Sequence, residues 1–236
     1  MCPDPRQALE DVIHQAAEYL AWLKADGVQQ VEIARKSEPP KGDPVSQELN
    51  TIATQISACK KCDLHKTRTN TVPGQGHTRP EIMFIGEAPG ADEDEQGLAF
   101  VGRAGQLLTK MIEAMGFKRD EVFIANIAKC RPPDNRQPTP EEMDTCIPYL
   151  KRQIVALQPK VIVALGAVAV KGLLQDFTGI SKVRGTWMKF GGIDVMPTYH
   201  PAYLLRNPPA KKEVWADLQL VLKRLGRTPP PVKKAE

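Results

Sequence analysis

Four cysteines constrain this chain more than any other feature of its sequence. Cys59 and Cys62 form a Cys-Lys-Lys-Cys pair, and Cys130 and Cys146 follow far downstream with fifteen residues between them. Four thiolates can close a complete cage around an iron–sulfur cluster or a zinc ion. Such a cage would tie the arginine- and proline-rich segment 131–138 to the first cysteine pair. The alternative is four unrelated buried thiols, since isolated C-x2-C pairs also occur by chance or as redox motifs.

The redox setting of the cysteines follows from their number and from the start of the chain. The sequence holds five cysteines, an odd count, and its first residues lack the basic and apolar regions of a secretory signal. No apolar run approaches the roughly 18 residues that a membrane-spanning helix needs. We therefore expect a cytoplasmic protein without a membrane anchor, whose thiols bind a metal or cluster rather than form disulfides.

Positive charge gathers in four places along the chain. The net charge is only +4, but basic residues cluster at 60–68, 129–136, 182–189 and 206–212. These clusters lie next to the segments that carry the candidate site residues. They indicate a polyanionic partner, and nucleic acid is the commonest partner of that kind.

Three regions divide the 236 residues. Residues 1–45 form an N-terminal extension, with an amphipathic helix predicted over 4–26 and a proline-rich linker at 36–44. Residues 46–226 are long enough for one globular domain. The tail, 227–236, is rich in proline and charge and is predicted to be disordered.

Strand-like and helical segments alternate through the main domain. Four short apolar runs indicate buried strands at Glu81–Ile85, Val122–Ala125, Val161–Leu165 and Asp194–Thr198. Helices are predicted over Ser46–Ala58, Arg103–Met115, Pro140–Leu157, Ala167–Phe177 and Lys211–Leu225. Because this alternation is typical of a parallel sheet covered on both faces, we predict an α/β fold. It would have three α/β/α layers and a four-stranded, mainly parallel sheet, with the N-terminal helix as an appendage.

The carboxyl ends of the predicted strands are where a ligand is expected, because open parallel sheets bind ligands there. Gly86-Glu-Ala-Pro-Gly90 follows the first strand, Asn126 the second and Tyr199-His200 the fourth. The glycine–proline turn is rigid and lets a ligand approach the backbone closely. By itself, this turn is explained equally well as a structural one.

Three side chains near these strand ends could contact a ligand. Phe100 precedes the predicted helix start at Arg103, where an aromatic ring can face a pocket. A buried Asn126 must find hydrogen-bond partners, either in a turn or in a ligand that offers one donor and one acceptor. Taken singly, Phe100, Asn126 and His200 each have a structural explanation as well.

Taken in order, these segments resemble the family-4 uracil-DNA glycosylases, the iron–sulfur members of the uracil-DNA glycosylase superfamily. The resemblance extends over about residues 46–225, and its pieces occur in the family's order with similar spacing. Each piece is modestly specific, whereas the ordered set is highly specific. The pieces are CKKC at 59–62, GEAPG at 86–90, ED-x-x-G-x-x-FVG-x-AG-x-LL at 93–108, NIAKCRPP at 126–133, Cys146 and HPAYLLRNP at 200–208.

The resemblance implies a cofactor and a pocket for a base. The four cysteines Cys59, Cys62, Cys130 and Cys146 would ligate a [4Fe–4S] cluster. The residues implied to bind uracil are Gly86, Glu93, Phe100, Asn126 and His200. In this arrangement Phe100 stacks on the base and Asn126 hydrogen-bonds its edge. Glu93 would lie where it crowds the C5 position.

The resemblance also implies a catalytic set made of His200, Glu87 and Ala88. His200 would contact a uracil carbonyl and stabilise the negative charge that develops there. Glu87 and the backbone around Ala88 would line the side from which water attacks. In the best-known family of the superfamily an aspartate stands at the position of Ala88. Catalysis is therefore expected to depend mainly on stabilising the leaving group.

A further set of residues is implied to contact DNA: Lys129, Arg131, Leu204, Leu205 and Arg206. The loop that begins at His200 would enter the minor groove, and Leu204 or Leu205 would fill the gap left by the flipped base. The expected substrate is uracil-containing DNA, single- or double-stranded. We expect a monomer whose N-terminal helix is available to a repair or replication partner.

The predicted function is a monofunctional uracil-DNA glycosylase that starts base excision repair. The main alternative is a non-catalytic nucleic-acid-binding protein of the same fold, with a cluster or zinc in the cage. A related member that traps the abasic sugar is disfavoured, because Ala88 stands where such members carry glutamine and the segment directly after Cys130 contains no histidine. A ferredoxin-like carrier is disfavoured because its cysteines normally lie in a compact run.

Overall fold

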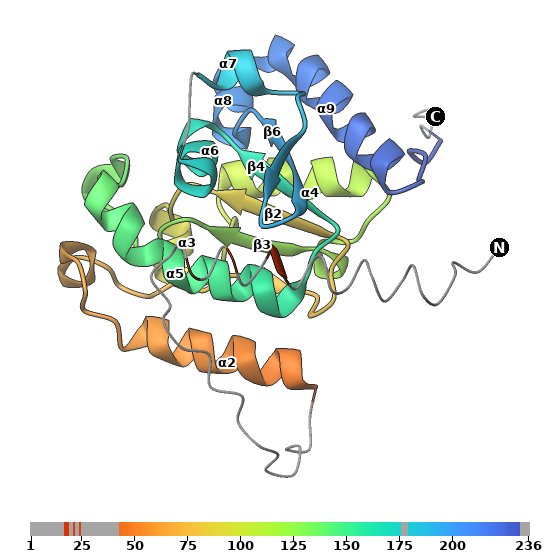
Figure 1. The fold of residues 1–236 in the computed structure, drawn as a ribbon. Coiled ribbons are helices and arrows are strands. Elements are labelled where there is room, and N and C mark those ends of the chain that lie inside the picture. Colours follow the sequence, from red (N-terminus) through yellow and green to blue (C-terminus); the bar gives the residue numbers. More distant parts are fainter. Residues whose placement is uncertain (1–16, 19–20, 22–23, 25–42, 176–178, 232–236) are drawn as a thin grey trace.

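A mainly parallel sheet forms the centre of the protein in the computed structural model, which describes residues 43–175 and 179–231 and, before them, residues 17, 18, 21 and 24. Within these residues the strands are β1 (Gln75–Gly76), β2 (Ile82–Gly86), β3 (Phe123–Asn126), β4 (Val161–Leu165), β5 (Met188–Phe190) and β6 (Ile193–Thr198). Their order across the sheet is β1-β3-β2-β4-β6-β5 (Figure 1). The four inner strands are parallel, and the two edge strands are antiparallel to their neighbours.

The prediction of four strands is wrong, because the sheet of the described residues has six. The four predicted runs form its parallel part, each within one residue of the expected bounds. The two extra strands are two and three residues long, too short to show an alternating pattern. A signal for β5 was nevertheless present. Gly191 and Gly192, both at positive φ, make the tight turn that joins it to β6.

The helices that surround this sheet in the described main domain are α2 (Pro44–Ser57), α3 (Ala91–Gln96), α4 (Arg103–Ala114), α5 (Pro140–Leu157), α6 (Ala167–Leu174), α7 (Ile180–Val183), α8 (Pro201–Arg206) and α9 (Lys211–Arg224). Five of them, α2, α4, α5, α6 and α9, lie close to their predicted positions, whereas three short helices, α3, α7 and α8, were not predicted. Short 3-10 turns cover Asp63–Lys66, Arg119–Glu121, Pro133–Asn135 and Pro208–Ala210. Helix α5 begins as predicted because Thr139 and Glu142 form a reciprocal capping box in front of Pro140.

Helices cover both faces of the sheet (Figure 1). Alternate residues of β2 point to opposite sides, so Phe84 packs in one core with Leu108 of α4 and Leu218 of α9. Met83 packs in a second core with Leu150 of α5. All five of these side chains are at most 1% exposed. Both faces of the central strands are therefore dry, as continuous apolar runs require.

Helix α2 packs outside α5 (Figure 1). Ile52 and Ile56 of α2 form a small apolar cluster with Tyr149 of α5. Arg152 of α5 donates to the carboxylate of Glu48 at 2.7 Å. This contact brings the segment that follows α2 alongside α5.

The two terminal regions are described only in part. The predicted helix over 4–26 lies outside the described residues, except that residues 17, 18, 21 and 24 are helical. Of the predicted linker at 36–44 only Asp43 and Pro44 are described, and they are the N-cap and first residue of α2. At the other end, Arg227 forms an ion pair with Glu81 at 2.5 Å and stacks over Phe117. The ordered contacts therefore extend one residue past the predicted boundary at 226. In the part of the chain described, no helix is long and apolar enough to cross a membrane.

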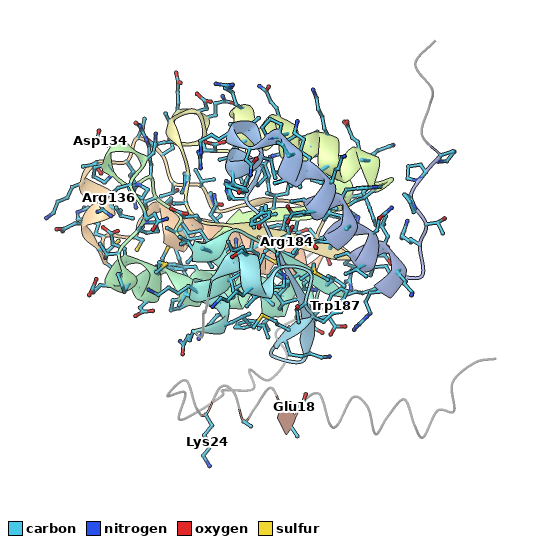
Figure 2. All side chains as sticks on the ribbon, turned by 90° about the horizontal axis from the view of Figure 1, so that it is seen from above. Glu18, Lys24, Asp134, Arg136, Arg184 and Trp187 are labelled. Carbon is cyan, nitrogen blue, oxygen red and sulfur yellow. The ribbon has the colours of Figure 1, made fainter. Side chains whose placement is uncertain are left out.

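A buried carboxylate joins the end of β6 to α9. Asp217 is 2% exposed and accepts a hydrogen bond from the Thr198 hydroxyl at 2.6 Å. The Arg184 guanidinium (Figure 2) donates to both of its oxygens, at 2.6 and 3.1 Å. Arg184 also pairs with the more exposed Glu213 at 3.2 Å. The network fixes the point where the chain leaves the sheet towards His200.

Replacing Asp217 with alanine should lower the free energy of unfolding by about 3–5 kcal/mol, because it leaves the Arg184 guanidinium and the Thr198 hydroxyl without their buried partner. Glu213→Ala removes the exposed partner of the same arginine and is the matched control, with an expected cost of about 0–1 kcal/mol. Urea unfolding followed by circular dichroism measures both. Equal costs for the two variants would contradict the role given to Asp217.

Candidate functional site

A cavity of about 830 Å³ opens at the carboxyl ends of the parallel strands. Its floor contains the residues that leave β2, β3 and β6, among them Glu87, Asn126 and His200. Phe100 lies on one wall, and Arg136 and Arg206 lie on others. The strand ends that the sequence pointed to therefore meet in one place.

Asn126 carries an unsatisfied acceptor in this cavity. The residue is 2% exposed, and its Oδ1 has no hydrogen-bond partner among the residues that the structure describes. Gly86 is its neighbour on β2, and a Cβ added there would come within 2.5 Å of both Asn126 Oδ1 and Phe100 Cζ. Only glycine therefore lets the amide and the ring close over this strand end. Because buried polar atoms normally have partners, the free Oδ1 indicates a ligand atom.

Phe100 is held in a conformation that its residue type rarely adopts. Its φ is +53°, which for a residue with a side chain costs on the order of 1–3 kcal/mol. Gly105 packs so closely against it that an added Cβ would lie 1.9 Å from the Phe100 carbonyl oxygen. The ring is 6% exposed and its centroid lies 5.6 Å from that of His200. The strained loop thus presents a fixed aromatic face beside the imidazole.

Glu93 organises the loops on both sides of the cavity. One carboxylate oxygen accepts hydrogen bonds from the backbone N–H groups of Val101 and Gly102, at 2.8 and 2.9 Å. The other accepts from the N–H of Gly90 at 3.1 Å. Glu93 lines the cavity as well. Its carboxylate ties the Gly86–Gly90 turn to the loop that carries Phe100.

His200 is a neutral hydrogen-bond donor at the floor of the cavity. Its Nδ1 accepts a hydrogen bond from the N–H of Ala202 at 3.1 Å and so caps α8. Burial and, to a smaller extent, the positive charge of Arg206 lower the pKa of His200 to about 4. Since Nδ1 is an acceptor, the single proton of the neutral ring sits on Nε2. The ring can therefore donate to a ligand without carrying a charge.

The Gly86–Gly90 turn is bonded to the residues that follow β3. The N–H of Ile127 donates to the Gly86 carbonyl, and the N–H of Ala128 donates to the Glu87 carbonyl, both at 3.0 Å. Burial raises the pKa of the Glu87 carboxyl, which lines the cavity. Ala88 lines it too, and packs against the small apolar cluster formed by Leu64, Ala128 and Cys130.

The four predicted cysteines surround a second, smaller cavity. It is lined by Cys59, Cys62, Cys130 and Cys146, and all four thiols are free. Arg68 donates to the Cys130 sulfur at 3.1 Å, and the N–H of Lys129 donates to the Cys146 sulfur at 3.2 Å. Burial raises the pKa of the Cys62 and Cys130 thiols and raises that of Cys146 to about 12. Thiols with pKa values raised in this way stay protonated in water at neutral pH and are deprotonated when they coordinate a metal.

Comparisons with known proteins agree with this geometry. The sequence model of the Uracil DNA glycosylase superfamily matches residues 73–219. A type-4 uracil-DNA glycosylase of Archaeoglobus fulgidus is 45% identical over 194 residues, covering 78% of this chain and 96% of its own. One from Sulfurisphaera tokodaii is 48% identical over 77% of this chain and 86% of its own. The chain belongs to the type-4 uracil-DNA glycosylases.

The superfamily match separates the two halves of the cysteine cage. It begins at residue 73 and includes Cys130 and Cys146 but neither Cys59 nor Cys62. The type-4 relatives, in contrast, align with 77–78% of the chain. The first cysteine pair thus lies in front of the part of the chain that the superfamily model matches.

Two residues predicted to contact DNA are buried in this type-4 chain, and those predictions are wrong. Lys129 is 1% exposed, its Nζ donates to Oε1 of Gln153 at 2.8 Å, and burial lowers its pKa to about 8. Leu204 is 1% exposed and belongs to the core beside α4 and α9. Leu205 is instead 38% exposed, and Arg206 is exposed at the cavity rim. Arg131 is half-buried and donates to Asn135 at 2.8 Å.

Several cavity residues carried no individual signal in the sequence. Arg136 makes a two-pronged ion pair with Glu142, at 2.7 and 2.8 Å, and lines the cavity. Figure 2 labels it at the edge of the molecule, well away from Trp187. Its place within the basic segment 131–138 was the only hint. The tilted rings of Tyr199 and Tyr203, with centroids 4.8 Å apart, also line the cavity, and in the sequence only their proximity to His200 marked them.

The neutral state of His200 predicts a specific pH dependence. An unfolded histidine titrates at a pKa of about 6.5, whereas burial lowers the pKa of folded His200 to about 4. The unfolded chain thus binds the extra proton between these values, so this contribution to stability is complete above about pH 6.5 and is lost as pH falls towards 4. Histidine NMR should find a neutral, Nε2-protonated ring at pH 7, with the resonance identified by its loss in His200→Asn. A titration midpoint near 6.5 would contradict this.

Proposed function

We propose that this type-4 family member is a monofunctional uracil-DNA glycosylase. It flips uracil out of DNA, hydrolyses the N-glycosidic bond and leaves an abasic site, which begins base excision repair. The observation that carries the proposal is the unsatisfied Oδ1 of Asn126, buried beside the Phe100 ring and the neutral His200. A donor, an acceptor and an aromatic face in one cavity match the groups of a nucleobase.

Asn126 accounts for the choice of uracil over cytosine. Uracil offers an acceptor at O4 and a donor at N3–H, so one orientation of a carboxamide satisfies both. The free Oδ1 accepts from N3–H, and the amide nitrogen donates to O4. Cytosine reverses both groups and would leave buried polar atoms without partners. Each such orphan costs roughly 1–3 kcal/mol.

Phe100 and Gly86 give the base its slot. The ring offers a flat apolar face on which the flipped base stacks, and Gly86 lets that ring lie close to Asn126 at the strand end. Extrusion of a base from a duplex costs a few kcal/mol. Stacking contributes about 1–3 kcal/mol per base, so the aromatic face offsets much of that cost.

His200 supports bond cleavage by stabilising the leaving group. As the bond between C1′ and N1 breaks, the electron pair stays with the base and negative charge grows on O2. The Nε2–H of neutral His200 donates to that oxygen, in the manner of an oxyanion hole. Water then adds its oxygen to C1′ and releases a proton. Glu87, on the water side with a raised pKa, is the candidate to orient that water.

The DNA strand is held by the rim of the cavity. Leu205 is the exposed leucine of α8 and fills the space that the flipped base leaves. Arg206 and Arg131 neutralise phosphates, and Arg136 joins them from the segment next to the cage. These contacts are compatible with single- or double-stranded DNA. Glu93 limits space near C5 by holding the Gly90 turn in place.

The four cysteines are proposed to hold a [4Fe–4S] cluster. Buried thiols with raised pKa values suit a metal centre that displaces their protons. Among the described residues, no three His, Cys, Asp or Glu side chains are arranged to hold a single metal ion. A cluster binds each cysteine to a different iron and so holds thiolates further apart, which favours it over zinc. Its role is structural, because a closed cage leaves no position for substrate.

The finer proposals about context follow from the sequence. We propose that the protein acts as a monomer in the cytoplasm and that its N-terminal helix binds a repair or replication partner. The globular part carries the whole cavity within one chain, so the reaction requires no second copy.

Uracil release tests the proposed function directly. The protein, purified without oxygen, should cleave uracil from a labelled oligonucleotide with one U:G pair, revealed by strand scission in alkali. Asn126→Ala and His200→Ala should each slow single-turnover release by roughly 100- to 1000-fold, since each removes a hydrogen bond that the transition state needs. No release from U:G or single-stranded substrate by intact wild-type protein would leave only a DNA-binding role.

Two further variants sharpen this assay. Lys223→Met changes an exposed side chain of α9 outside the cavity lining and serves as a control for the preparation, with activity close to wild type. Glu87→Gln removes a charge on the water side without changing size. Full single-turnover activity in Glu87→Gln would remove the carboxylate from the mechanism and leave the backbone to position the water.

Loss of one cage cysteine tests the proposed cofactor. Cys130→Ala should give colourless, poorly folded protein, because the cage opens beside Ala88 and the turn that packs on it. Iron analysis and visible absorption are the measurements. A stable Cys130→Ala protein with normal activity would show that the turn needs no support from the cage.

A further inference from the structure

Lys129 is a buried cation without an ordinary counter-charge. Its side chain is 1% exposed, and its Nζ donates to the neutral amide of Gln153 at 2.8 Å. Across residues 43–175 and 179–231 it forms no ion pair with a carboxylate; the one acidic group that acts on it electrostatically is the thiol of Cys146. Removing a charge from water without an opposite charge is costly. The fold therefore needs a reason to keep an ammonium here.

The cysteine cage lies on the same side of α5 as the lysine's partner. Cys146 and Gln153 are seven residues apart on this helix, which places them on one face two turns from each other. The Lys129 N–H donates to the Cys146 sulfur at 3.2 Å, and Lys129 lines the cavity that the four cysteines surround. Lys129 thus contacts the cage residue Cys146 through its backbone and holds its ammonium on the same face of α5 as that cysteine.

A second cation contacts the cage from the opposite segment. Arg68 donates from one guanidinium nitrogen to the Cys130 sulfur at 3.1 Å and from another to the Ser57 carbonyl at 2.9 Å. Arg68 is only partly buried, so water screens its charge, whereas nothing screens that of Lys129. Of the two, Lys129 has the stronger electrostatic effect on whatever the cage holds.

We propose that Lys129 is the built-in counter-cation of the cysteine cage and sets the reduction potential and retention of the cluster bound there. The inference rests on the [4Fe–4S] cluster proposed above. Four thiolates leave such a cluster anionic, and net charge and hydrogen bonds to sulfur are the main determinants of its potential. A buried ammonium stabilises the more negative, reduced state. It also makes release of the anionic cluster less favourable, because release would leave the ammonium uncompensated.

The test compares variants of the cluster-loaded full chain. Lys129→Met and Lys129→Gln both remove the charge at nearly constant size. Gln153→Met keeps the charge and removes its neutral hydrogen-bond partner. Lys60→Met removes an exposed positive charge that is equally close to the cysteines in sequence, next to Cys59. The readouts are iron content, midpoint potential by spectroelectrochemistry, and the rate of iron release to a chelator.

The charge-removing variants should shift the midpoint potential to more negative values and release iron roughly tenfold faster, as expected when one member of a buried charge pair is lost. Gln153→Met and Lys60→Met should leave the midpoint potential close to that of the wild type and change the rate of iron release by less than about twofold. Complete loss of the cluster in both Lys129 variants, with the cluster retained in Gln153→Met and Lys60→Met, would also support the proposal.

Two results would overturn it. Lys129 variants that match Lys60→Met would mean that the buried charge does not act on the cage. Equal effects of Lys129→Met and Gln153→Met on the potential and on iron release would mean that Lys129 acts only through its hydrogen bond to Gln153, and not through its charge. Wild-type protein without iron is a different result, which would reject the proposed cofactor and not the charge argument.

Discussion

The pairing of Gly86 with Asn126, where β2 and β3 end side by side, is the contact on which the rest of the site depends. The missing side chain at Gly86 is what allows the Asn126 amide and the Phe100 ring to approach the same point. The hydrogen-bond ladder then continues past the sheet through Ile127 and Ala128. Two residues later the chain reaches Cys130. This one strand pairing thus fixes the relative positions of Asn126, the Glu87 turn and the cysteine cage.

Much of this arrangement could be predicted because it follows from local pattern. Buried parallel strands appear as continuous apolar runs, and β4 at Val161–Leu165 matched its prediction at both ends. Lys129 and Leu204 could not be assigned correctly in the same way. Each sits in a segment otherwise rich in contacts with solvent or ligand, and only tertiary packing decides that Lys129 turns inward towards Gln153. A motif identifies which residues belong together, but burial decides which of them can reach DNA.

The site also concentrates features that cost stability. Phe100 has a positive φ, Asn126 keeps an acceptor without a partner, and Lys129 is a charge in the interior. Each lowers the stability of the empty fold. The packed structure around them keeps these three residues in place. The Glu93 carboxylate fixes the loop of Phe100, and the two apolar cores hold the strands. Such local departures from the folding rules are expected where function is located.

His200 has a second role whose consequence is mechanical. The same ring that faces the pocket also accepts the hydrogen bond that begins α8, the helix of Leu205 and Arg206. In the proposed function, the helix that would contact the strand and the ring that would meet the leaving base are therefore joined at the end of β6. A strand bound incorrectly along α8 would then turn the imidazole away from the base. Correct binding of DNA would thereby become a condition for catalysis.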